Sequence, residues 1–198
     1  MRNLLAATLI AFSSIALAQK SVPPPAKPAD NGPSLEVTMK FIQEKLNDQG
    51  TFNYVEFIHD DADGSDWTRR WSETQASFKA DPGTCTVGYH YNVVTDKKDD
   101  SPRQYDLGFS LREVKALSVM TSHQAKTTQM NDRGYAWTIR TVPTFFVLRV
   151  TTVDSSPAKL RVPPSDLNFH DEDTANRVAR ALNHAVELCG GGEKDEPF

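Results

Sequence analysis

Two stretches of the chain carry apolar residues at helical spacing, one near each end. In the first, apolar residues recur at intervals of three and four, at Leu35, Met39, Ile42 and Leu46. This spacing predicts a helix over about 35–48 with a single apolar face. Ser34 is a suitable N-cap for it, and Gly50 can end it.

The second helical stretch lies at 171–189. Asp171 or a neighbour can cap it, and acidic residues follow in its first turn. Gly190 stands where a C-terminal cap is expected. One face collects small and apolar side chains, at Ala175, Val178, Ala179, Leu182, Ala185, Val186 and Cys189. The small alanines predict close packing of this helix against a sheet or the rim of a barrel.

Between the helices the apolar positions alternate with a period of two, which indicates half-buried strands. Asp63-Gly64 is a strong hairpin signal, and other turn sequences occupy 81–83, 99–102 and 131–134. We expect about seven strands, at 52–58, 67–78, 87–93, 105–109, 116–121, 135–141 and 144–152. No helix is expected between them, so parallel winding is disfavoured. The predicted class is α+β, with a strongly bent antiparallel sheet or a partly open barrel.

A tight turn over Leu111 to Val114 joins two of these strands. The step "strand, Leu-x-x-Val, strand", followed by a closing helix, resembles pleckstrin-homology-like and GRAM-like domains. The segment 169–189 is also similar to the end of an uncharacterised family of exported bacterial proteins. The resemblance implies a bent barrel of about seven strands with one mouth closed by the C-terminal helix. The helix at 35–48 departs from the minimal domain, and no basic loop cluster of the kind that binds phosphoinositides is present.

The first 18 residues have the layout of a cleaved secretory signal peptide. Arg2 supplies the positive charge, an apolar run follows, and Ala16-Leu17-Ala18 predicts cleavage after Ala18. A membrane anchor or a buried helix is the alternative, but the apolar run is short for a span of about 20 residues. The remaining chain is predicted to comprise a proline-rich linker at 19–33, one domain at 34–190 and a flexible tail at 191–198. The linker composition would also suit a ligand of a proline-recognising groove.

Charge and hydropathy restrict the expected cellular compartment and the expected classes of partner. The chain has 198 residues, a formal net charge of −4 and a pI near 5.7. A dedicated nucleic-acid binder is usually basic, so nucleic acid is not an expected partner. Apart from the signal segment no apolar stretch is long enough to cross a membrane. We therefore predict a secreted or periplasmic protein without a transmembrane segment.

The two cysteines allow one intramolecular bond, Cys85 with Cys189. Export to an oxidising compartment favours this disulfide, which would tie the last helix to the sheet. The alternative is a pair of separate buried thiols. No Cys-x-x-Cys motif or catalytic signature surrounds either residue.

The histidines and acids give no metal-ligand spacing. His59 and the nearby aspartates form the densest candidate cluster, and Asp61 to Gly64 superficially resemble an EF-hand loop. With Gly64 as the sixth loop residue, the twelfth is Arg70, where a bidentate glutamate belongs. A solvated hairpin turn is the favoured interpretation. No hydrolase, P-loop or dinucleotide motif occurs, so we predict no catalytic, metal or cofactor residue.

One strand carries a candidate strip for ligand contact. Trp67, Arg69 and Trp71 share a face, which places an arginine between two indoles. The strip could stack on a ligand, or it could be cation–π packing within the sheet. Packing is the favoured interpretation.

These observations predict a non-catalytic binding or interaction module of the cell envelope. Its partner would be an envelope protein, or a peptide added to a strand edge. The alternative is a hydrolase whose site assembles only in three dimensions. Function through self-association is a third hypothesis, and the oligomeric state stays open.

Overall fold

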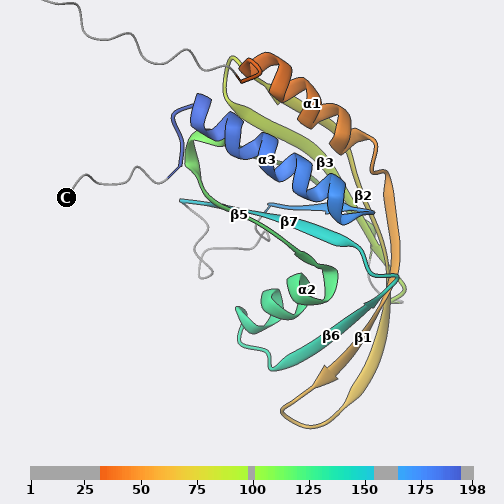
Figure 1. The fold of residues 1–198 in the computed structure, drawn as a ribbon. Helices are drawn as coiled ribbons and strands as arrows, with labels where there is room; N and C mark the ends of the chain where they lie inside the picture. Colours follow the sequence, from red (N-terminus) through yellow and green to blue (C-terminus); the bar gives the residue numbers. More distant parts are fainter. Residues whose placement is uncertain (1–31, 98–100, 154–164, 193–198) are drawn as a thin grey trace, which may run out of the picture. The chain divides into compact units, whose positions relative to one another are not determined.

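The computed structural model describes residues 32–97, 101–153 and 165–192 (Figure 1). The predicted signal peptide, the linker up to residue 31 and the tail from residue 193 lie outside the described residues. From Pro33 onward the chain forms one unit. None of the described helices is long and apolar enough to cross a membrane.

The described chain contains three α-helices, one short 3-10 turn and eight strands. They follow one another as α1 (Leu35–Asn47), β1 (Thr51–Asp60), β2 (Asp66–Asp81), β3 (Thr86–Thr95), β4 (Arg103–Ser110), the 3-10 turn (Leu111–Glu113), β5 (Val114–Thr121), α2 (Ser122–Asn131), β6 (Trp137–Val142), β7 (Phe146–Thr152), β8 (Ser165–Phe169) and α3 (Glu172–Leu188). The α+β class, both terminal helices and the turn after β4 are thus confirmed.

The strands form two antiparallel sheets instead of one bent sheet or barrel. The larger sheet has the order β4-β3-β2-β1-β6, and the smaller has the order β5-β7-β8. Figure 1 shows α2, α3 and the smaller sheet on the concave side of the larger one. The prediction of one strongly bent sheet or partly open barrel of about seven strands was therefore wrong in the number of sheets and of strands. Within the described residues β4 and β6 are the edges of the larger sheet and do not pair with each other, so that sheet does not close.

Two elements were not expected from the sequence. Helix α2 lies between β5 and β6, contrary to the prediction that no helix separates the strands. Its sequence has no apolar stripe that would predict a helix. In the structure only Ser122 and Ala125 of this helix are buried. Strand β8 is the other addition, and it leads directly into the cap of α3.

The main core lies between α1, α3, the smaller sheet and the adjoining half of the larger sheet. Helix α3 contributes the face predicted from the sequence, with Ala175, Val178, Leu182, Ala185 and Val186 buried. It meets apolar residues of both sheets and of α1, among them Met39, Ile42, Phe78, Val87, Leu148, Leu167 and Phe169. Burial of this continuous cluster is what fixes the two sheets relative to each other.

The end of α3 is fixed in three ways. Gly190 adopts a φ of +74°, and the backbone N–H groups of Gly190 and Gly191 donate to the carbonyls of Glu187 and Val186. This is the paired hydrogen-bond pattern of a left-handed helix cap. Gly191 also lies against the 3-10 turn, where a Cβ would come 2.3 Å from the Leu111 carbonyl oxygen.

The third constraint is the disulfide. Cys85 and Cys189 are bonded, with their Cα atoms 6.0 Å apart, so the predicted disulfide is confirmed. It joins the turn between β2 and β3 to the C-terminal end of α3.

Candidate functional site

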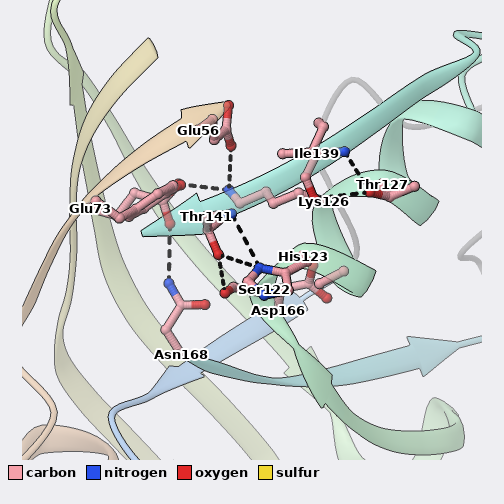
Figure 2. Close-up of polar contacts among 12 residues, drawn as sticks. Glu56, Glu73, Ser122, His123, Lys126, Thr127, Ile139, Thr141, Asp166 and Asn168 are labelled. Carbon is pink, nitrogen blue, oxygen red and sulfur yellow. Dashed lines mark hydrogen bonds and ion pairs between the residues drawn. The ribbon is translucent and has the colours of Figure 1, made fainter. Parts of the chain in front are cut away.

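Helix α2 is held against the larger sheet mainly by polar contacts. It begins with a capping box, in which the Thr121 hydroxyl accepts the Gln124 N–H and the Gln124 side chain accepts the Thr121 N–H at 3.0 Å. This box fixes the start of a helix that has little apolar surface to bury. Lys126, one turn further on, projects toward the inner face of the sheet (Figure 2).

The Lys126 ammonium is enclosed by two carboxylates and two aromatic rings. Its Nζ lies 2.9 Å from Glu73 Oε1 and 3.9 Å from Glu56 Oε1. It also lies 5.3 Å from the centre of the Tyr54 ring and 5.5 Å from the Trp71 ring. The Lys126 side chain is 18% exposed and the two glutamates are 5% or less. Such enclosure strengthens the ion pairs, because little water screens them.

The two glutamates differ in pKa although they share one lysine. Burial alone would raise the pKa of Glu73, but Lys126 and hydrogen bonds from Tyr54 and Asn168 outweigh burial and lower it. Burial raises the pKa of Glu56, and Lys126 at its longer distance compensates only in part. Burial would lower the pKa of Lys126, but the two carboxylates raise it. As the pH falls, Glu56 therefore takes up a proton before Glu73 does.

A second, partly buried ion pair continues this network into the smaller sheet. Arg149 makes a two-pronged contact with Asp166, with Nε–Oδ1 at 2.9 Å and Nη2–Oδ2 at 2.8 Å. The same Nη2 donates to the Ala125 carbonyl at 3.1 Å. The guanidinium thereby ties β7 and β8 to helix α2.

A chain of hydroxyl groups ends at His123. Ser122 Oγ lies 2.5 Å from Thr141 Oγ1, which lies 2.9 Å from His123 Nδ1 (Figure 2). Ser122 Oγ also accepts the Phe145 N–H at 3.1 Å, and Ser122 is fully buried. A serine nucleophile must be reached by its substrate, so this arrangement positions α2 and does not expose a reactive hydroxyl.

Side chains of two helices replace missing strands at two edges of the larger sheet. In α1, Asn47 donates to the Phe78 carbonyl at 3.2 Å and accepts the Phe78 N–H at 2.9 Å, beyond the point where β1 stops pairing with β2. In α2, the Thr127 hydroxyl accepts the Ile139 N–H of β6 at 3.0 Å (Figure 2). His123 Nδ1 accepts the next outward N–H of β6, that of Thr141, at 3.2 Å.

The edge of the smaller sheet at β8 is closed in the same manner. The Gln75 side chain accepts the Asn168 N–H at 2.9 Å and donates to the Asp166 carbonyl at 2.6 Å. Just after β8, Gln49 accepts the His170 N–H at 3.1 Å. An amide side chain presents one donor and one acceptor, as a neighbouring strand would.

Strand β4 differs from these edges. It pairs with β3 along its whole length without a register shift, and among the described residues no side chain bonds its other edge between Gln104 and Gly108. Gln104, Asp106 and Gly108 are exposed, and Tyr105 is 40% exposed. A regular, exposed edge of this kind is a template for a further strand.

A groove of about 450 Å³ lies over the paired strands β3 and β4, lined by His90, Tyr91, Asn92, Gln104, Tyr105 and Asp106. Among the described residues the buried Asn92 side-chain oxygen has no hydrogen-bond partner. The remaining edge strand, β5, has a register shift between Val114 and Ala116 with the exposed Lys115 at that point. Bulges and lysines disfavour strand addition.

The structure places the predicted strip on the concave face of β2. Trp71 stacks on Tyr54, and the Arg69 guanidinium lies 5.5 Å from the Trp71 ring. Trp67 instead meets Trp137 of β6 edge-to-face at 5.0 Å. Arg69 also lies opposite the buried Glu56 in the strand register. The three residues share a face but do not form one continuous stack.

The acidic turn after β1 is held by hydrogen bonds of its own backbone and side chains. Asp63 accepts the Ser65 N–H at 2.9 Å, and His59 Nδ1 lies 3.0 Å from Asp66 Oδ1. In the described part of the chain no three His, Cys, Asp or Glu side chains are grouped as metal ligands.

The sequence reasoning missed the buried ion cluster. A signal was present, because Glu56 follows Phe52 and Tyr54 in the alternation that predicts the buried face of β1. Its partner Lys126 stands in the helix that was not expected. The chain matches no family model, no curated protein and no solved structure.

Proposed function

We propose that this protein is an exported, non-catalytic binding module that takes an extended peptide segment of a partner protein as an added strand along β4. The proposal rests on one observation, that the outer edge of β4 differs from the other free strand edges of the two sheets. Side chains bond the backbone at the free edges of β2, β6 and β8, and β5 carries a bulge, whereas β4 is regular and exposed. Main-chain hydrogen bonds would supply affinity, and side-chain pockets would supply specificity.

The groove along β4 suggests what the peptide carries. Tyr105 points to the concave face and Asp106 to the convex face, so alternate peptide residues would meet different surroundings. His90, Gln104 and Asp106 line the groove and favour a polar peptide residue on the convex face. The Trp67, Arg69 and Trp71 strip remains a candidate ligand contact on the other face.

The sequence and the disulfide both support the proposed compartment. The signal-like segment at 1–18 and the bonded Cys85 and Cys189 support a secreted or periplasmic protein. Two features support the pleckstrin-homology-like architecture as a prediction, namely the C-terminal helix packed on strands and the turn after β4.

Site-specific photo-crosslinking in the native envelope tests this proposal. A photoreactive residue replaces Gln104 or Asp106 on β4, and the control positions are the exposed Asn183 and Glu187 on α3. We expect one adduct of defined mass from both β4 positions and none from the controls. Adducts equally frequent at all four positions, or from the controls alone, would contradict the proposal.

A hydrolase is the second candidate, because Glu56 and Glu73 are two neighbouring carboxyl groups with opposite pKa shifts. We rank it second because both side chains are 5% exposed or less, and they line neither the groove over β3 and β4 nor the groove that contains Val55 and Val142. Turnover of an ester, peptide or glycoside substrate that is abolished in Glu56→Gln would favour the hydrolase instead.

A further inference from the structure

The convex face of the larger sheet carries an apolar patch made by β1 and β6. Val55 lies opposite Val142 in the strand register, and Phe57 follows Val55 on the same face. Phe57 is 39% exposed and Val142 is 44% exposed. Adjacent aliphatic and aromatic side chains at this level of exposure are a feature of interaction surfaces.

A groove extends the patch across the sheet. It has a volume of about 460 Å³ and runs from Val142 past Val55 and Arg70 to Val94 and Asp96. Val94 is itself 37% exposed. Within the described residues no helix covers this side of the sheet (Figure 1).

Two arginines border the apolar residues. Arg140 lies opposite Phe57, with its guanidinium 4.4 Å from the centre of the ring. Arg70 lies opposite Val55, and its backbone N–H donates to Asp96 at 3.1 Å. Among the described residues neither guanidinium forms an ion pair, so both have donors to offer a partner.

We propose that this face binds a segment of a partner protein in which carboxylates stand beside aliphatic side chains. The arginines would pair with the carboxylates while Val55, Phe57, Val94 and Val142 bury the aliphatic groups. A second copy of this chain is the other protein occupant that the experiments below distinguish. The proposal does not depend on strand addition at β4, which lies at the far edge of the sheet.

Selection from a displayed library of random 12-residue peptides tests the chemistry of the partner. Wild-type protein is compared with R70E/R140E and with the matched control R112E/R180E, which changes the net charge equally at exposed positions elsewhere. Circular dichroism confirms that each variant is folded. Peptides selected on wild type and on the control should be enriched in Asp, Glu and aliphatic residues.

On R70E/R140E the enrichment should switch to Lys and Arg, and peptides from the wild-type selection should bind about tenfold more weakly. Selected peptides without acidic enrichment, or with the same enrichment on R70E/R140E, would overturn the proposal. Peptides that bind along β4 would be indifferent to these two arginines, so the two proposals fail separately.

Two further measurements address other occupants of the same face. Sedimentation velocity of the protein alone should show a monomer; a dimer that is lost in Val142→Asp would assign the face to a second copy and overturn the proposal. Phosphatidylglycerol vesicles should not co-sediment with the protein. Co-sedimentation lost in R70E/R140E would assign the face to a membrane and would likewise overturn it.

Discussion

Gln75 accepts the backbone N–H of Asn168 at 2.9 Å, although the two residues belong to different sheets. The other end of the same amide donates to the Asp166 carbonyl at 2.6 Å. One side chain on the inner face of β2 therefore satisfies the free edge of β8. Since Gln75 and Asn168 are both 4% exposed, water cannot replace these bonds.

Gln75→Met should destabilise the fold by about 2–4 kcal/mol, because it leaves a buried N–H and a buried carbonyl unpaired. Urea unfolding followed by tryptophan fluorescence measures this loss. Gln104→Met, the same change at an exposed edge position, is the control and should lie within about 0.5 kcal/mol of wild type. Equal effects of the two substitutions would show that the Gln75 amide does not close the edge of β8.

Glu73→Gln should destabilise the protein by about 3 kcal/mol at pH 7, because Lys126 loses its close buried partner. The folded-state pKa of Glu73 lies below its ordinary value of 4.5. Its contribution is therefore present above about pH 4.5 and is lost as the pH falls through the folded-state pKa. The difference between wild type and variant should shrink on acidification below pH 4.5.

Glu56→Gln should behave oppositely, although Glu56 contacts the same lysine. The folded-state pKa of Glu56 lies above its ordinary value of 4.5, so ionised Glu56 costs stability at neutral pH. The variant should equal wild type or exceed it by up to about 1 kcal/mol at pH 7, and this gain should vanish below pH 4.5. Chemical denaturation at pH 4, 5.5 and 7 compares the two variants. A larger loss from Glu56→Gln than from Glu73→Gln would contradict the assigned roles.

The paired variant C85S/C189S should lose about 4–5 kcal/mol of stability, because the bond closes a loop of about 100 residues in the unfolded chain. Urea unfolding of the oxidised wild type, the reduced wild type and the variant measures the effect. Reduction of the wild type should reproduce the loss, and the reduced protein should match the variant. Unchanged unfolding midpoints would mean that the disulfide does not constrain the unfolded chain.

The predictable parts of this fold are those that nearby residues determine. The spacing in α1 and α3, the caps Ser34 and Asp171 and the Asp63-Gly64 hairpin gave correct elements, because each signal spans only a few residues. The seven expected strands are present for the same reason. The cysteine count and the predicted export favoured the disulfide over two separate thiols, and the structure confirms it.

The elements that were not predicted depend on tertiary contacts. Helix α2 is stabilised by partners distant in sequence, such as Glu73 for Lys126 and Ile139 for Thr127. Its own sequence carries no apolar stripe, so the local pattern did not predict it. Strand β8 is five residues long and is completed by Gln75, about ninety positions earlier in the chain. Which strand edges are bonded by side chains and which are exposed depends on how the sheets assemble, so the sequence alone does not predict it.

Residue-resolved hydrogen exchange of the free protein tests the central claim, the accessibility of the β4 edge, most directly. The backbone N–H groups of Ile139, Thr141 and Asn168 point outward from their strands and are bonded by side chains, so they should exchange slowly. Alternate N–H groups between Gln104 and Gly108, facing the open side of β4, should exchange at least a hundredfold faster, on the order expected for unbonded amides. Uniform slow exchange along β4, comparable to that of Ile139 and Asn168, would show that this edge is already covered and would contradict the account.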